Sequence, residues 1–198
     1  PGASNMTDEI VEGIKQDFSA FEKALYSYDY DHRKYGYKNL IDVDSFVDYF
    51  LINEFTCNYD AGWLSTFLYK DVDGKFRMCI WDFNSACDNY QDSMMNWDSF
   101  ELQNALWYFM LMKDEGFTAR CIERYRELRK TYLNEAYLDA YIDDVVAYLG
   151  SAIDRNYEKW GYLFGEEYDM LRPANRNPRS YEESISDMKN FLADRGEW

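Results

Sequence analysis

The stretch that decides the fold is STFLYKDVDGKFRMCIWD, residues 65–82. Apolar and polar side chains alternate with a period of two over residues 65–70 and again over residues 75–81, which is typical of strands. The four residues between these runs, 71–74, end in a glycine and form a turn. The pattern predicts a β-hairpin in which Phe76, Met78 and Ile80 share one face.

On both sides of this hairpin, apolar residues recur with the period of an α-helix. Upstream we expect a helix capped by Thr7, an aromatic-rich polar loop over residues 26–39, and a second helix that is capped by Asp42 or Asp44 and reaches about residue 55. Downstream we expect helices over residues 98–113, 115–132, 134–160 and about 180–195. The predicted fold class is mainly α (α+β), a helical body with one central β-hairpin, because an isolated hairpin is marginal in water and must pack on helices.

Length and composition indicate a single acidic globular domain over residues 1–198. The chain carries 37 Asp and Glu against 21 Lys and Arg, a net charge of −16, and 19% of its residues are aromatic. A nucleic acid or an anionic membrane requires clustered positive charge, so we expect neither as a partner. No apolar run approaches the ~20 residues that span a bilayer. The chain begins at Pro1 without a methionine, and we expect it to be a piece of a longer protein.

Two aspartates flank the predicted hairpin. If Lys70 pairs with Lys75 across the turn, Trp63 lies opposite Asp82. Asp60 precedes the first strand and Asp82 follows the second, so both belong to the same open end, on the order of 10 Å apart. The hairpin therefore predicts that Asp60 and Asp82 come together.

Amide side chains surround the same end of the hairpin. Asn58 and Asn84 lie next to these aspartates in the sequence, and Glu54 lies one helical turn before Asn58 on an apolar stripe, where a carboxylate requires a partner. Carboxylate and amide oxygens suit a hard divalent cation such as Mg²⁺, and a second carboxylate could orient or deprotonate a hydroxyl. The alternative is that these residues are caps and turn residues on a solvated rim.

Other chemistry-bearing residues favour structural interpretations. The cysteines Cys57, Cys79, Cys87 and Cys121 show no metal-binding spacing and are either buried thiols or include one bridge. Residues 120–130 form the one basic stretch. The spacings of Glu123 with Arg126 and of Glu127 with Lys130 predict a solvated helix face, with docking to an acidic neighbour as the alternative.

The many aromatic residues raise the possibility of carbohydrate binding. Several of them follow a helical period, which favours packing in the core or between helices over stacking on sugars: Trp97, Trp107, Tyr108, Tyr132 and Tyr137. A carbohydrate-binding function would require an exposed row of tyrosine or tryptophan rings.

Six short motifs carry a family resemblance. They are IDVDSFVDYFLINEF (41–55), NYD (58–60), STFLYKDVDGK (65–75), WDFN (81–84), RNYEKW (155–160) and MKNFLADRGEW (188–198). In this order and spacing the chain resembles the spore-coat protein H (CotH) kinase family, an atypical relative of the protein kinases, from about residue 7 to the end. The resemblance implies the C-terminal lobe of a kinase-like fold, from which the nucleotide-gripping N-terminal lobe, upstream of Pro1, is missing.

The resemblance also implies a reaction, the transfer of the ATP γ-phosphoryl group to a protein hydroxyl. Asp60 would be the catalytic aspartate that positions the acceptor hydroxyl, and Asp82 would bind Mg²⁺. Asn58 and Asn84 would be further metal ligands. Family members often carry a second acid where this chain has Asn84, so one negative charge is missing from the implied metal site.

Further expectations follow from the same family. The partners would be a protein substrate with an acceptor hydroxyl and the upstream lobe of the same chain, and the location would be extracellular, on the cell surface or in the spore coat of a bacterium. Without the upstream lobe, we expect residues 1–198 to have no appreciable kinase activity. The alternative function is a non-catalytic surface or coat-assembly module that keeps the kinase-like fold.

Overall fold

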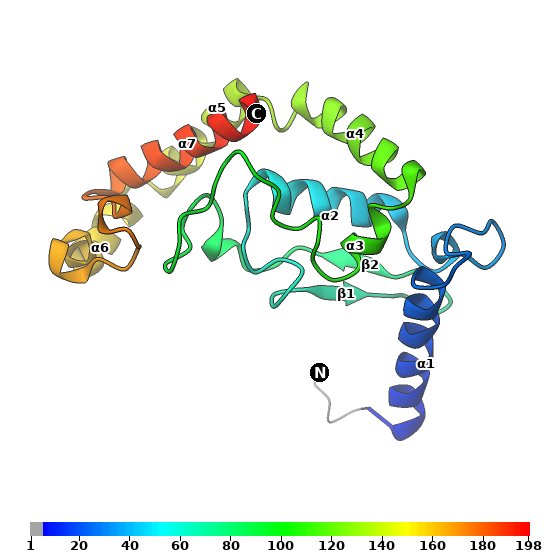
Figure 1. The fold of residues 1–198 in the computed structure, drawn as a ribbon. Helices are drawn as coiled ribbons and strands as arrows, with labels where there is room; N and C mark the ends of the chain where they lie inside the picture. Colours follow the sequence, from blue (N-terminus) through cyan, green and yellow to red (C-terminus); the bar gives the residue numbers. More distant parts are fainter. Residues whose placement is uncertain (1–5) are drawn as a thin grey trace.

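The computed structural model describes residues 6–198 as a helical body with one two-stranded antiparallel hairpin (Figure 1), which confirms the predicted mainly α (α+β) class. In chain order the elements are α1 (Asp8–Leu25), η2 (Tyr37–Asn39), α2 (Val43–Phe55), β1 (Phe67–Tyr69), β2 (Arg77–Cys79), η3 (Phe83–Ser85), α3 (Tyr108–Leu111), α4 (Glu115–Arg129), α5 (Glu135–Leu149), α6 (Ser151–Trp160), η4 (Gly161–Phe164), η5 (Glu166–Tyr168), η6 (Ala174–Arg176) and α7 (Tyr181–Glu197). The η elements are short 3₁₀ helices. None of the helices over residues 6–198 combines the length and the apolar character that a bilayer crossing requires.

Helix α2 is the centre of the fold. It begins at the cap Asp42, whose side chain accepts a hydrogen bond from the backbone N–H of Ser45. Apolar residues on several of its sides are buried, among them Phe46, Phe50 and Phe55. The helix lies between the hairpin and α4 and also contacts α7 (Figure 1). A helix surrounded on several sides needs apolar residues all round, which explains the density of aromatic residues in this stretch.

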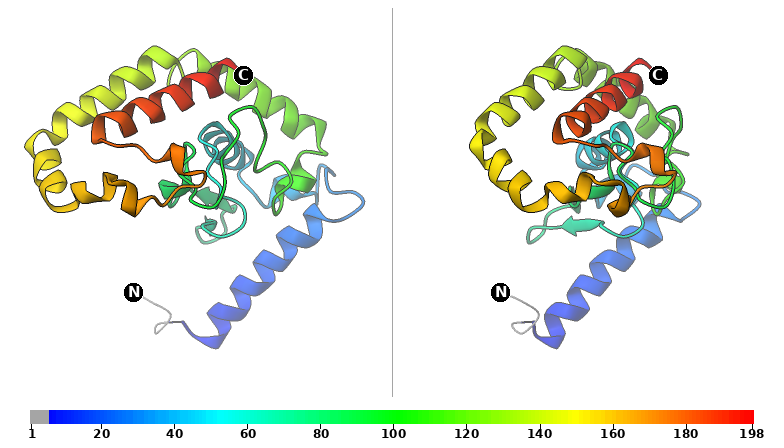
Figure 2. Two further views of the ribbon diagram at one scale, coloured as in Figure 1. Left: turned by 60° about the vertical axis from the view of Figure 1, so that its left-hand side comes forward. Right: turned by 90° about the vertical axis from the view of Figure 1, so that its left-hand side faces the viewer.

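Helix α1 joins this core with its C-terminal half only. Thr7 caps it as predicted, and Phe21 and Leu25 are fully buried. Ile10 and Ile14, which continue the same apolar stripe toward the N-terminus, are about half exposed, and this end projects away from the body (Figures 1 and 2).

The hairpin forms with a register one residue away from the predicted one. Phe67 pairs with Cys79 and Tyr69 with Arg77, whereas pairing of Lys70 with Lys75 would place Phe67 opposite Met78. Phe76 lies outside this ladder, because it forms a bridge with Ile41 in the segment before α2. This tertiary contact explains why β2 begins only at Arg77.

The helix predicted over residues 98–113 is wrong for most of its length. Only Tyr108–Leu111 is α-helical, and residues 97–107 form turns and loops. The backbone N–H groups of Glu101 and Leu102 donate to a buried side chain, Glu54, in place of helical carbonyls, and Leu106 has a positive φ of 48°. A polar side chain from elsewhere in the chain therefore replaces the helical hydrogen bonds.

The helix predicted over residues 134–160 is divided at Gly150, whose φ is 47°, into α5 and α6. Neither helix has a buried residue. Leu138 and Ile142 of α5 pack partly against Leu192 of α7. Helices α5 and α7 run side by side (Figure 2). The segment from α5 through α6 to residue 180 therefore forms an open arch with little core of its own.

The basic stretch shows both of the predicted arrangements. Glu123, Arg126, Glu127 and Lys130 form an exposed face, whereas Arg120 and Arg124 dock on acidic residues of α2. Arg120 donates to Asp44 and Arg124 to Asp48, each at 2.8 Å. The same two arginines also reach Glu123 and Glu127, in place of the predicted Arg126 and Lys130. These half-exposed ion pairs help to align α4 on α2.

The structure decides between the interpretations of the cysteines and of the aromatic residues. All four cysteines are free, and burial raises the pKa of the Cys57, Cys87 and Cys121 thiols to about 12. Trp107 and Tyr108 lie in the core as predicted. Three other rings, which are 43% to 62% exposed, lie outside the core, and two of them, Tyr132 and Tyr137, pack edge to face on each other: Trp97, Tyr132 and Tyr137.

Candidate active site

The turn that follows α2 carries Asn58 and Asp60. The helix ends at Phe55, and Cys57 then adopts a left-handed conformation with a φ of 47°. The backbone N–H of Asn58 donates to the carbonyl of Asn53 at 2.9 Å, and the carbonyl of Asp60 accepts from the N–H groups of residues 63 and 64. The backbone of Asp60 is therefore held in place from within its own turn.

Gly62 lets this turn lie close against the loop that precedes α3. Its φ is +79°, and a Cβ atom at this position would lie 2.3 Å from Leu102 Cδ1 and 3.0 Å from Ala105 Cβ. Its N–H donates to Thr66 Oγ1 at 2.9 Å. Glycine meets both demands, a positive φ and no side chain. The turn that bears Asp60 is thus supported by a segment far away in the sequence.

The side chains of Asn53 and Asn58 form a buried amide pair. Asn58 Nδ2 donates to Asn53 Oδ1 at 2.9 Å, and Asn53 Nδ2 donates to the carbonyl of Tyr49 at 2.8 Å. Both asparagines are 2% exposed. Asn58 Oδ1 is buried without a hydrogen-bond partner among residues 6–198. Buried polar atoms are normally satisfied, so this oxygen is a candidate ligand atom.

Asp82 and Asn84 lie where the hairpin leads into η3. Asp82 has a φ of 59° and an exposed side chain, and Ser65 Oγ donates to its Oδ2 at 3.1 Å across the end of the hairpin. Asn84 lies within η3, and its backbone carbonyl accepts from Asn89 Nδ2 at 2.8 Å. Aspartate adopts this left-handed conformation more readily than most residues, and the hydrogen bond from Ser65 holds the Asp82 carboxylate at the open end of the hairpin.

One cavity of about 480 Å³ brings two of the four predicted site residues together. Asp60 and Asn84 lie on its wall, whereas Asp82 and Asn58 do not. Asp60 supplies the only acidic or basic side chain on the wall. The other residues on the wall are Ser85, Asn89, Tyr90, Gln91, Leu163, Phe164, Tyr168, Met170, Leu171, Asn177 and Pro178.

The far wall of this cavity belongs to the segment before α7, which sequence reasoning did not connect with the site. Arg176 holds this segment in place. Its Nη2 donates to Asp88 Oδ1 at 2.7 Å and to the carbonyl of Tyr90 at 3.0 Å, and its Nε donates to Asp88 Oδ2. Arg176 and Asp88 are far apart in the sequence, so no local sequence pattern predicts that they pair.

Glu54 has the buried partner that its sequence position requires. Its carboxylate accepts from the N–H groups of residues 101, 102 and 103 at 2.6–3.0 Å and pairs with Arg195 Nη2 at 3.3 Å. Burial raises the pKa of the Glu54 carboxyl, against these donors and Arg195, which lower it. Arg195 also donates to the carbonyls of Trp97 and Ser99 and lies over the Trp198 ring. Glu54 is therefore fully occupied within the fold.

The oxygen atoms at this end of the hairpin suit a hard divalent cation. No group of three or more His, Cys, Asp or Glu side chains in the described part of the chain is arranged to hold a metal. A cation here would rely on Asp60 and Asp82 together with the amide oxygens of Asn58 and Asn84. The unpartnered Asn58 Oδ1 fits such a ligand set, because a buried carbonyl oxygen without a donor can bind a cation.

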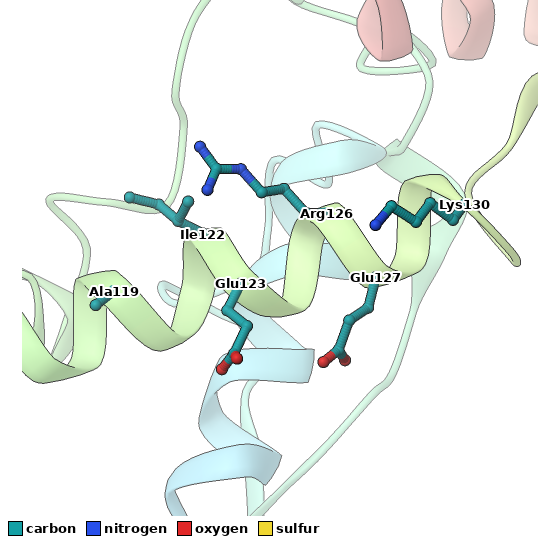
Figure 3. Close-up of a pocket in the computed structure, with 6 residues that line it drawn as sticks. All are labelled: Ala119, Ile122, Glu123, Arg126, Glu127 and Lys130. Atoms are coloured by element: carbon teal, nitrogen blue, oxygen red, sulfur yellow. The ribbon is translucent and has the colours of Figure 1, made fainter.

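Two other surfaces contain no predicted site residue. One is a hollow of about 650 Å³ on the exposed side of α4 (Figure 3), lined by Ala119, Ile122, Glu123, Arg126, Glu127 and Lys130. The other is on α5, where the rings of Tyr137 and Tyr141 lie 6.3 Å apart and nearly parallel, both exposed. These rings are part of the kind of row that carbohydrate binding requires, on a different element from the cavity.

The fold and this site together define a class, a mainly helical domain with one hairpin in which an acid and an amide from the two sides of that hairpin line one cavity. The family model described as CotH kinase protein matches residues 3–198. The chain therefore belongs to the CotH kinase family, which confirms the resemblance. Neither a search of curated proteins nor a search of solved structures found a match.

Proposed function

We propose that this chain is the C-terminal lobe of a CotH-family protein kinase that transfers the γ-phosphoryl group of ATP to a protein hydroxyl. The observation that carries the proposal is the shared cavity, since Asp60 and Asn84 come from segments on either side of the hairpin and line the same wall. The family match supports the type of reaction.

In this proposal Asp60 acts on the acceptor. Its carboxylate accepts a hydrogen bond from the acceptor hydroxyl and takes the proton as the hydroxyl oxygen bonds to the γ-phosphorus and the bond to the ADP oxygen breaks. Asp82 holds Mg²⁺ and Asn58 and Asn84 are its further ligands. When bound, Mg²⁺ neutralises the charge on the phosphate oxygens. Positioning and charge neutralisation supply most of the rate in such transfers, so few residues are needed but each must be well placed.

The nucleotide-gripping lobe belongs upstream of Pro1 in this proposal. Two sets of exposed apolar side chains, one on α1 and one on the hairpin, support a partner surface. Ile10 and Ile14 of α1 are about half exposed, and Phe67 and Trp81 pack edge to face on the hairpin while 49% and 61% exposed. We expect residues 1–198 alone to show no appreciable phosphorylation, and the bacterial parent protein to act on the cell surface or in the spore coat.

The experiment is ATP- and Mg²⁺-dependent autophosphorylation by the full-length parent. Asp60→Ala and Asp82→Ala are each expected to lower the rate by about 10²-fold or more, the range for losing one preorganised charged group. Asp71→Ala is the matched control, because it removes an exposed acid at the turn end of the same hairpin. Unchanged activity in both site variants would remove this mechanism.

A second function has specific support. Asn84 stands where family members often carry an acid, and Asp82 does not line the cavity. Both observations favour a surface or coat-assembly module that keeps the kinase-like fold without catalysis. A parent protein that binds neither ATP nor Mg²⁺, yet assembles normally when Asp60 and Asp82 are replaced, would favour this second function.

A further inference from the structure

Asn53 is a buried amide that the proposed mechanism does not use. It lies near the end of α2 and is 2% exposed. It is joined to Asn58 twice, since its backbone carbonyl accepts from the Asn58 N–H and its side-chain oxygen accepts from Asn58 Nδ2, both at 2.9 Å. A polar residue in a helix that is otherwise surrounded by apolar core is costly unless it is fully bonded.

The bonds of Asn53 determine which way the Asn58 amide points. Asn53 Nδ2 donates to the carbonyl of Tyr49, which can only accept, so Asn53 must present its oxygen to Asn58. Asn58 must then present its nitrogen to Asn53. The remaining atom, Asn58 Oδ1, is therefore fixed as a free acceptor, two residues before Asp60.

This free oxygen is the one buried side-chain N or O atom without a partner among residues 6–198. Asp60, which follows Asn58 by two residues, lies on the cavity wall with Asn84. An acceptor without a donor attracts a cation or an ordered water molecule. Two hydrogen bonds, from Asn53 to Tyr49 and from Asn58 to Asn53, thus orient the Asn58 side chain. Its oxygen accepts no hydrogen bond from residues 6–198.

We infer that Asn53 is a positioning residue, which locks the Asn58 amide so that its Oδ1 serves as a divalent-cation ligand. The inference rests on the proposed function, because it assigns a support to one of the proposed metal ligands. Partners of metal ligands typically change metal affinity by 10- to 100-fold when they are removed.

The test is a Mn²⁺ titration of the purified 198-residue chain. Free Mn²⁺ is measured by electron paramagnetic resonance, and paramagnetic broadening of the Asn58 side-chain NH₂ signal is followed by NMR, with Asn58→Ala used to assign that signal. Asn53→Leu is expected to weaken Mn²⁺ binding by about 10-fold or more. In its protonated form, Asn53→Asp can donate to the Tyr49 carbonyl and accept from Asn58 Nδ2, so this neutral side chain is expected to keep the affinity near that of wild type.

A control separates positioning from general loss of stability. Tyr108→Phe removes a buried hydrogen bond of 2.9 Å from the Tyr108 hydroxyl to the Phe46 carbonyl. Phe46 lies in α2, the helix of Asn53, but this bond does not involve Asn58. It is expected to leave Mn²⁺ affinity unchanged. An equal loss of affinity in Asn53→Leu and Tyr108→Phe, or no loss in a folded Asn53→Leu chain, would overturn the inference.

The remaining outcomes distinguish the inference from the proposed function. A folded Asn58→Ala chain that binds Mn²⁺ as tightly as wild type would overturn the inference alone, since the free oxygen of Asn58 would then contribute nothing to the binding. A wild-type chain that binds no Mn²⁺ would overturn both the inference and the metal assignment of the proposed function.

Discussion

Two polar regions adjoin the end of α2, and their acidic side chains differ in how they are bonded. In the buried junction, formed by Glu54, Arg195 and the backbone of residues 97–103, the carboxylate is 4% exposed and meets four donors. In the candidate site, formed by Asn58, Asp60, Asp82 and Asn84, the acids face a cavity or solvent, and one buried oxygen has no partner.

The difference separates an acid that holds the fold from acids that are free to act. Glu54 ties α2, the loop before α3 and α7 together, so its bonding capacity is used up inside the protein. Asp60 is held mainly through its backbone, which leaves its carboxylate free for a ligand. Substitutions in the two regions should therefore change different quantities, stability in the junction and ligand binding in the site.

The largest expected effect is on the junction. Arg195→Leu leaves Glu54 buried without its charge partner and removes donors from the carbonyls of Trp97 and Ser99. Breaking a buried pair in this way typically costs about 3–5 kcal/mol in the free energy of unfolding. The measurement is urea unfolding followed by circular dichroism.

Lys189→Met provides the matched control in the same helix. It removes an exposed ion pair with Asp143, which is worth at most about 1 kcal/mol. Equal effects of Arg195→Leu and Lys189→Met would contradict the distinction between a structural junction and an ordinary surface pair.

A smaller loss is expected at the turn that carries Asp60. Gly62→Ala adds a Cβ atom 2.3 Å from Leu102 Cδ1 at a residue with a φ of +79°. Strain and overpacking of this kind cost about 1–3 kcal/mol. Gly13→Ala, in α1 with nothing within 4 Å of the new Cβ, should instead stabilise slightly. Thermal unfolding of both variants checks this, and a Gly62→Ala chain as stable as wild type would contradict the close packing of the turn.

The pH dependence of stability should differ in sign between Glu54 and a second buried acid, Asp114. Burial raises the pKa of Glu54, so the folded state holds its proton more tightly and its contribution to stability falls as pH rises above about 4.5. Burial also disfavours the Asp114 carboxylate, but hydrogen bonds from Lys38 and Tyr37 prevail and lower its pKa. Its contribution is therefore lost as pH falls below about 3.8.

Glu54→Gln and Asp114→Asn test these two signs by urea unfolding between about pH 3 and pH 7, the range that covers both ordinary carboxyl pKa values. In wild type, the contribution of Glu54 to the free energy of unfolding declines above pH 4.5, and that of Asp114 declines below pH 3.8. Glu54→Gln should remove the first decline, and Asp114→Asn should remove the second. The same sign in both variants would contradict the assigned causes.

The smallest expected effect is on stability at the candidate site. Asp60→Asn and Asp82→Asn alter side chains that bear no structural ion pair among residues 6–198, so the free energy of unfolding should change by less than about 0.5 kcal/mol. The same variants should lose activity in the full-length parent. Strong destabilisation by either substitution would place that aspartate with Glu54, as a residue that holds the fold.

Local patterns predicted much of the fold. The caps Thr7 and Asp42, the helices α1 and α2 and the alternation of the hairpin all depend on residues close in sequence, and these predictions are confirmed. The pattern also placed Glu54 on an apolar stripe and so required a partner for it. It could not identify Arg195 as that partner, because nothing in the spacing links the two residues.

The errors share one cause. Residues 98–113 have a helical period, but Glu54 and Arg195 bind the backbone of the loop before α3 and replace its helical hydrogen bonds. Strand β2 begins only at Arg77, because Phe76 pairs with Ile41. In each case a contact between distant segments outweighs a local preference.

For the candidate site, the sequence by itself determined the residue types, which are acids and amides just before and just after a hairpin. Through its motifs it also determined the CotH kinase family. Only the tertiary structure decided that Asp60 and Asn84 share a cavity, that Arg176 and Asp88 hold its far wall, and that Asn53 leaves one oxygen of Asn58 free. The physical reason is that spacing fixes what lies within a turn or a hairpin, whereas cavities and unsatisfied atoms arise where segments far apart in the chain pack together.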